Sequence, residues 1–224
     1  MKILMFLFSI HTLIFSAAFN ATDTFINVPI AKQHKYNELQ FGGSFGYNGS
    51  PSIQIEEKNR YEMDFKAAFA INNQHQFAIT LVNSQQAVLH HQYTLSKEYE
   101  TSQVAIGIKN ITGNDFSTWE SQDYVEANNM SPYIVNTFYN KGSMFSIGYG
   151  LRAFQHTKST LSGIGGFVEN LNGIFFGFGI TREIVTIMGE YDGKDINFGI
   201  RIHTDSDYEF NLALTEQFID GDFN

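Results

Sequence analysis

MFSIGYGLRAF, residues 144–154, alternates large apolar side chains with small or polar ones. Phe145 and Ile147 fall on one side of this alternation, whereas Ser146 falls on the other. Successive side chains of a β-strand point to opposite faces, so the stretch predicts a strand with one apolar and one polar face. The pattern recurs about every ten residues along most of the chain, which is typical of a transmembrane β-barrel.

Twelve segments carry this alternation. We therefore expect an all-β fold, an up-and-down antiparallel transmembrane β-barrel of about 12 strands, with a range of about 10 to 14. An even number is the rule for single-chain bacterial outer-membrane barrels. The expected strands are 38–47, 60–71, 74–83, 87–95, 101–109, 132–140, 144–154, 163–170, 174–181, 184–191, 195–203 and 207–218.

The 224 residues are expected to form one domain behind a targeting segment. Residues 1–18 start with a basic Lys2, continue through an apolar stretch and end in small residues, as a secretory signal peptide does. This stretch is shorter than the ~20 apolar residues of a membrane-spanning helix. We expect residues 19–36 to form an extended periplasmic segment, 37–218 to form the barrel and 219–224 to form a C-terminal tail.

The composition fits a barrel better than a bundle of membrane helices. Charged residues make up 17% of the chain, aromatic residues 15%, and the mean hydropathy is −0.18. Such averages suit a barrel because every second residue of a strand faces a polar lumen. The net charge of −9 argues against nucleic acid as a partner, since binding it needs a basic surface. The absence of cysteine excludes disulfides and thiolate metal sites.

The connections between the expected strands fall into two length classes. Outer-membrane barrels have short periplasmic turns and longer outer loops, so we expect the two classes at opposite ends of the strands. Asn and Gly accept the positive φ of tight hairpin turns. The expected tight turns are 72–73, 141–142, 172–173 and 193–194, and the long polar connections are 48–59, 110–131 and 155–162.

Charged and amide side chains on the polar faces are candidates for lining the lumen. A two-residue turn at 193–194 places Glu190 opposite Asn197. A turn around residues 204–206 places Arg201 opposite Glu209. Such side chains either hold the lumen together as a structural network or select ions or saccharides. The candidate lumen-lining residues are Glu62, Asp64, Lys66, Arg152, Glu190, Asn197, Arg201 and Glu209.

No residue spacing indicates a catalytic centre, a cofactor site or a metal site. His90 and His91 are adjacent, so they point to opposite faces of a strand and do not chelate one metal ion together. The acidic turns at 192–195 and 205–207 lack the ligand number of a Ca²⁺ loop. We therefore expect a protein that is not an enzyme and carries no cofactor.

Residues 190–201, EYDGKDINFGIR, form an acidic hairpin followed by an Asn-x-Gly-x-Arg strand. With FINVP at 25–29 and GIKNI at 107–111, this stretch resembles the YjbH-type outer-membrane barrels, which are associated with exopolysaccharide production. The resemblance touches residues 25–217. It implies an outer-membrane accessory or export barrel for polysaccharide, and it supplies no catalytic residue.

The leading hypothesis is a pore or envelope-structure protein of the cell outer membrane. Its expected partners are outer-membrane lipid and polysaccharide or small polar solutes. Two alternatives stay open. A soluble secreted β-barrel that binds a lipophilic ligand would place the apolar face of its strands inside. An outer-membrane lipid-modifying enzyme would need a Ser, a His and an acidic residue that converge in space.

Overall fold

The computed structural model describes residues 24–35, 37–47, 61–82, 86–96, 101–111, 130–154, 171–193, 196–204 and 208–214. These residues form β-strands and one short 3-10 helix. The elements are β1 (Leu39–Tyr47), β2 (Tyr61–Ala70), β3 (His75–Val82), β4 (Gln86–Thr94), β5 (Ser102–Lys109), β6 (Ser131–Asn140), β7 (Ser143–Gly150), η4 (Arg152–Phe154), β8 (Ile174–Arg182), β9 (Val185–Tyr191), β10 (Ile196–His203) and β11 (Glu209–Leu214).

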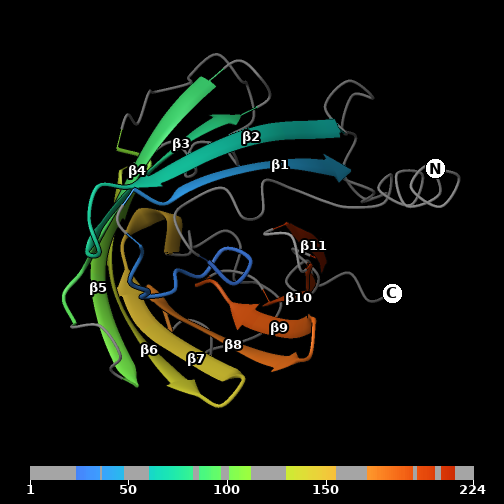
Figure 1. The fold of residues 1–224 in the computed structure, drawn as a ribbon. Coiled ribbons are helices and arrows are strands. Elements are labelled where there is room, and N and C mark those ends of the chain that lie inside the picture. Colours follow the sequence, from blue (N-terminus) through green and yellow to red (C-terminus); the bar gives the residue numbers. More distant parts are fainter. Residues whose placement is uncertain are drawn as a thin grey trace, which may run out of the picture.

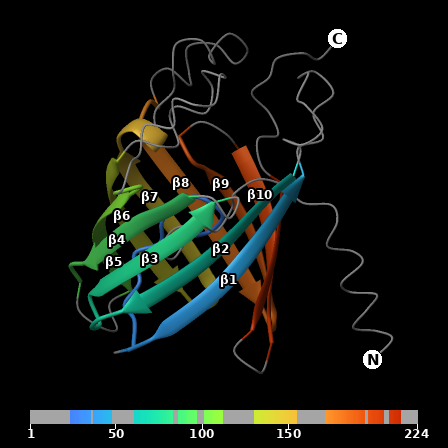
Figure 2. The ribbon, with the colours of Figure 1, turned by 90° about the horizontal axis from the view of Figure 1, so that it is seen from above.

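The eleven strands join one antiparallel sheet in which every strand pairs with its neighbours in sequence. The predicted all-β, up-and-down arrangement is therefore confirmed. The sheet curls around a central space, with β1 and β11 at its two ends (Figure 1). The view turned by 90° shows β1–β4 on one side of this space and β7–β9 on the other (Figure 2). In the described part of the chain, β1 pairs with β2 and β11 with β10, and no pairing joins β1 to β11.

Helices contribute little to this architecture. Across the described ranges, we find no helix with the length and apolar character needed to cross a membrane. Residues 1–18, where the sequence predicts a signal peptide, lie outside the described residues, as do residues 215–224.

The strand order differs from the predicted one at one place. The sequence predicts a strand at 163–170, which lies outside the described residues. However, β7 pairs directly with β8 from Ser143↔Ile180 to Tyr149↔Ile174. The sheet therefore has no strand between them, and the described part contains eleven strands in place of the expected twelve.

This difference reverses the expected position of two turns. Since β7 and β8 are antiparallel neighbours, every strand from β8 onward runs opposite to the expected direction. The turn residues 172–173 and 193 consequently lie at the same end of the sheet as the long connections 48–60 and 110–130, not at the opposite end. Short connections at 71–74, 141–142 and 183–184 share the other end.

The predicted strand 144–154 is shortened at its end. β7 stops at Gly150, and Arg152 adopts a positive φ of 57° within η4. The chain turns here so that the buried Phe154 ring packs over Gly150. Arg152 is thus an exposed residue whose Nη1 donates to the Met130 carbonyl over 3.1 Å, and it does not lie on the inner face of a strand as predicted.

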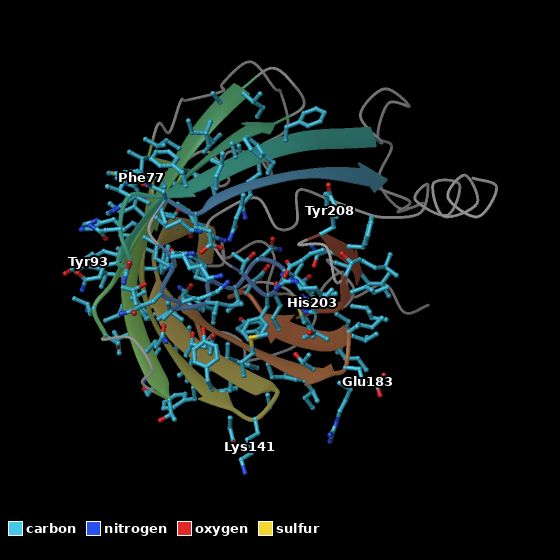
Figure 3. All side chains as sticks on the ribbon, viewed as in Figure 1. Phe77, Tyr93, Lys141, Glu183, His203 and Tyr208 are labelled. Atoms are coloured by element: carbon cyan, nitrogen blue, oxygen red, sulfur yellow. The ribbon has the colours of Figure 1, made fainter. Side chains whose placement is uncertain are left out.

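The two faces of the sheet have opposite character. Phe198 is 45% exposed, whereas its neighbours Asn197 and Gly199 are buried. Figure 3 shows side chains that project outward all along the convex side of the sheet, with Phe77 and Tyr93 labelled on β3 and β4. The predicted apolar faces are therefore outside, and they carry, among others, Phe65, Ile79, Ile106, Ile134, Ile147, Tyr149, Phe178, Ile200 and Leu212.

The two last hairpins test the predicted registers. Glu190 lies opposite Asn197, as predicted. In the final hairpin Arg201 lies opposite Asn211, and His203 lies opposite Glu209, so the predicted Arg201–Glu209 register is wrong by two residues. A shift of two keeps every side chain on its face, so the apolar pattern does not distinguish the two registers. The turn distinguishes the two registers, because Thr204 N and Thr204 Oγ1 both donate to Tyr208 O, and Tyr208 N donates to Thr204 Oγ1.

This register makes a disulfide test possible in a chain without cysteine. We expect His203→Cys/Glu209→Cys to cross-link readily under mild oxidation, because directly opposed residues on paired strands lie within disulfide range. Arg201→Cys/Glu209→Cys is the matched control, and its diagonal Cα separation of about 7–8 Å exceeds that range. Gel mobility with and without reductant measures the extent of cross-linking in the two double-cysteine variants. Preferential cross-linking of the control pair would restore the register predicted from the sequence.

Candidate functional site

Residues 24–35 lie against the concave face of the sheet, in the space that it encloses (Figure 1). The sequence places them in an extended periplasmic segment. Phe25, Ile26 and Val28 are each 0% exposed. A tight turn forms where Phe25 N donates to Val28 O over 2.9 Å, inside the bridge between Thr24 and Pro29. We call residues 24–35 the plug segment and residues 24–29 its turn.

The carboxylate of Glu190 on β9 binds the backbone of this turn. Its Oε2 accepts hydrogen bonds from the backbone N–H groups of Ile26 and Val28, both at 3.0 Å, and its Oε1 accepts from the Asn27 N–H at 2.8 Å. Asn197 Nδ2 on β10 donates to Oε1 at 2.9 Å. Glu190 is 3% exposed, so four donors replace the water that a carboxylate normally binds.

Two cations bind the carbonyl groups of the same turn. Lys109 Nζ on β5 donates to Asn27 O at 2.6 Å. Arg201 Nη2 on β10 donates to Thr24 O at 3.0 Å and to Phe25 O at 3.2 Å. The turn therefore has its amides paired with an anion and its carbonyls paired with cations. A buried backbone without secondary-structure partners needs such pairing.

Glycines on the inner face make room for the apolar side chains of the turn. A Cβ added at Gly177 would lie 2.6 Å from the Phe25 ring, and one added at Gly179 would lie 3.1 Å from it. A Cβ at Gly199 would lie 3.0 Å from Ile26 Cδ1. The plug segment thus fills the space that the glycines of β8 and β10 leave.

An apolar cluster on the inner face completes the contact with the turn. Phe25 and Val28 belong to one buried cluster with Phe154, Phe175 and Met188. The rings of Phe154 and Phe175 are 4.6 Å apart between centroids. The burial of such large apolar surfaces is the main favourable term in the packing of the plug segment.

The second half of the plug segment lies against polar side chains. Gln92 Nε2 donates to Ile30 O at 3.0 Å, and Tyr139 OH donates to Ala31 O at 2.7 Å. Thr137 Oγ1 accepts from Ala31 N at 2.8 Å. These side chains come from β4 and β6, so the segment crosses several strands without joining the ladder of any of them.

Glu38 holds the chain where it leaves the concave space and enters β1. Its carboxylate accepts from Lys35 N at 3.0 Å and from Gln40 Nε2 at 3.0 Å, and it lies 3.4 Å from His34 Nδ1. Partial burial disfavours the charged form, but the hydrogen bonds from Gln40 and Lys35, together with the nearby positive charges of Lys32 and His34, outweigh it and keep the pKa of Glu38 below its ordinary value. His34 N also donates to Asn73 O, at the end with the short connections.

Apart from Arg152, which is exposed just after the end of β7, the predicted lumen-lining residues separate into three groups. Glu190, Asn197 and Arg201 do meet on the inner face, around the plug segment. Glu209 is the first residue of β11. Its side chain is 49% exposed, and its Oε2 lies 3.7 Å from Arg201 Nε. Lys66 is half-buried on β2, and Glu62 and Asp64 occupy alternate positions of the same strand, with side chains outside the described set.

Sequence reasoning missed the plug segment and the partners that bind it. Lys109, Gln92, Thr137 and Tyr139 each lie on the polar side of an alternating strand, but nothing local indicates what they bind. The available signal was the run of inward glycines on β8 and β10. A concave face with so little side-chain volume implies that something else fills it.

The histidines take the predicted faces but form one unexpected pair. His90 is buried on the inner face, and His91 is half-buried on the outer face. His75 Nδ1 lies 3.1 Å from His91 Nε2, beside the Tyr93 ring. Within the described ranges, no group of three or more His, Cys, Asp or Glu residues is placed to hold a metal ion.

No protein-family model, curated protein or solved structure matches this chain. The resemblance to YjbH-type barrels therefore stays a prediction.

The glycine contact provides a matched pair of variants. Gly177→Ala should lower the free energy of unfolding by about 1–3 kcal/mol, because its Cβ overlaps the Phe25 ring in a filled space. Gly42→Ala, also on an inner face, should be neutral or slightly stabilising, since nothing lies within 4 Å of its added Cβ. Denaturant unfolding monitored by circular dichroism measures both.

A double variant checks that the plug segment causes the difference. In a Phe25→Ala background, Gly177→Ala should lose its cost because the overlapping ring is gone. An equal cost in both backgrounds would show that Phe25 does not occupy this space.

Proposed function

We propose that this protein is an integral β-barrel of a bacterial outer membrane whose lumen is closed by its own plug segment. The single observation that carries this proposal is the distribution of polarity. Large apolar side chains cover the convex face, and Gln76, Thr80, Gln92, Thr137 and Ser146 are buried on the concave face. A strand surface in lipid needs this arrangement, whereas a water-soluble barrel needs the inverse.

The soluble alternative fits this distribution less well. A secreted barrel that binds a lipophilic ligand would line its interior with apolar side chains and present polar ones to water. Here the interior wall bears amides, hydroxyls and a carboxylate beside the apolar cluster of Phe154, Phe175 and Met188, and residues 24–35 of the same chain already occupy the space next to that cluster. The convex face would expose a continuous apolar surface to water, which soluble monomers avoid.

The sheet edges bear on the same proposal. In lipid, every backbone N–H and C=O must be paired within the protein, so spanning sheets close into barrels. We propose that β1 and β11, the two ends of the curled sheet, meet in the membrane and close it as a parallel pair, since eleven consecutive antiparallel strands give the first and the last strand the same direction. Pairing across this seam would satisfy the free edges that the open sheet leaves.

A lumen that is closed by the plug segment limits the roles that we propose for this protein. With the plug segment in place, the protein serves as a structural component of the envelope, and it conducts only when that segment leaves. The wall behind the segment offers hydroxyl and amide groups from Gln92, Thr94 and Thr137. Such groups suit polysaccharide or small polar solutes, the ligand class that we propose. Within the described residues, we find no contact that favours the lipid-modifying enzyme over this role.

The lipid face can be tested with a single tryptophan. In a Trp119→Phe background, which removes the only native tryptophan, Phe198→Trp places the probe on the convex face and Tyr139→Trp places it on the concave face. After refolding into vesicles with brominated acyl chains, the indole at position 198 should be strongly quenched and the indole at position 139 should not. Equal quenching at the two positions, or none at position 198, would refute the membrane proposal.

A further inference from the structure

The contacts of residues 24–29 are those of a bound ligand more than those of a strand. The turn is closed by its own Phe25–Val28 hydrogen bond, and six further backbone groups of the turn bind side chains of the sheet. Glu190 contacts three backbone amides in a row, and Arg201 and Lys109 contact three carbonyls. We propose that the inner face of β5 and β8–β10 is a binding site for a peptide turn, and that residues 24–29 are its exchangeable ligand.

The site recognises both the backbone and the side chains of the turn. The carboxylate of Glu190 requires successive amides that converge on one point, which an extended chain does not present. Gly177 and Gly179 select a ring at the position of Phe25, and Gly199 admits the branched side chain of Ile26. Asp192 Oδ2 accepts from Asn27 Nδ2 at 3.2 Å and so favours an amide at that position. The preferred ligand is therefore an aromatic-aliphatic-Asn turn.

Exchange is feasible because the turn adds no strand to the sheet. The β8–β9–β10 ladder is complete without it, with Glu190 paired to Asn197 and to Gly177. When the turn leaves, the polar groups that bound it are the carboxylates of Glu190 and Asp192, the ammonium group of Lys109 and the guanidinium group of Arg201, all of which water can solvate. The site thus keeps its walls when it is empty, as a preformed binding site does.

This inference rests on the proposed function only in saying that an empty site opens the lumen. The test therefore separates binding from conduction. Residues 24–35 are replaced by a Gly/Ser linker of the same length, and a fluorescent synthetic peptide of residues 24–35, TFINVPIAKQHK, is added to the refolded variant. Fluorescence anisotropy measures binding, and planar-bilayer recording measures the current.

We expect saturable binding of this peptide and no binding of a scrambled one. Glu190→Gln should weaken binding by roughly tenfold or more, because an amide NH₂ replaces one of the two acceptor oxygens and the charge is lost. Glu183→Gln, in the exposed turn after β8, removes the same charge away from the site and should change nothing (Figure 3). The absence of binding, or binding that is insensitive to Glu190→Gln, would overturn the proposed site.

The current separates the two proposals. If the peptide binds and also blocks a current through the linker variant, the binding site and the closed lumen are both supported. If the peptide binds in a Glu190-dependent way but the linker variant carries no current, the binding site stands and the closed-pore part of the proposed function fails.

A second measurement uses the full chain, in case the linker variant does not fold. Hydrogen–deuterium exchange should be faster at the amides of Ile26, Asn27 and Val28 than in the paired strand β9, because the turn opens without global unfolding. Glu190→Gln should accelerate exchange in the turn and leave β9 unchanged. Exchange of the turn only at the rate of β9 would show that it is a permanent part of the core, and would overturn exchangeability.

Discussion

The carboxylate of Glu190 is the interaction on which the interior depends. It lies on the inner face of β9, is almost fully buried and accepts four hydrogen bonds, three of them from backbone amides of the plug segment. A buried carboxylate is costly unless its oxygens are satisfied, and a buried turn is equally costly unless its amides are satisfied. Each group supplies what the other needs. The two therefore stabilise each other inside the sheet, although 164 residues separate Ile26 from Glu190 in the sequence.

The concave and the convex face of the curled sheet require different surroundings. On the concave side, the glycines of β8 and β10 reduce the side-chain volume, and Phe25 and Ile26 of the plug segment fill the space. The apolar side chains of the convex side do not pack into this core, so they need another apolar environment. Lipid is the environment that we propose, and it would also require the edges β1 and β11 to be paired. The proposed function therefore needs three features together: an apolar convex face, a concave face whose polar and apolar side chains bind the plug segment, and two edges at the same side of the curled sheet (Figure 1).

Local sequence predicted a large part of this arrangement. Alternation with a period of two assigned the strands, and it placed Phe198 outside and Asn197 inside. The short connection at 192–195 was enough to pair Glu190 with Asn197. The same alternation does not respond to a shift of two residues, so the register of Arg201 was decided by the bonds between Thr204 and Tyr208.

Two features depend on long-range contacts alone: which residues occupy the interior, and in which direction the strands after β7 run. The pairing of β7 with β8 reversed the expected ends of the turns after residue 171, because it removed one strand from the order. The partners of residues 24–35 come from β4, β5, β6, β9 and β10. Contacts over such distances in sequence leave no periodic signal. The residues 25–29 and 190–201 stood out in the sequence separately, and only the fold brings them into contact.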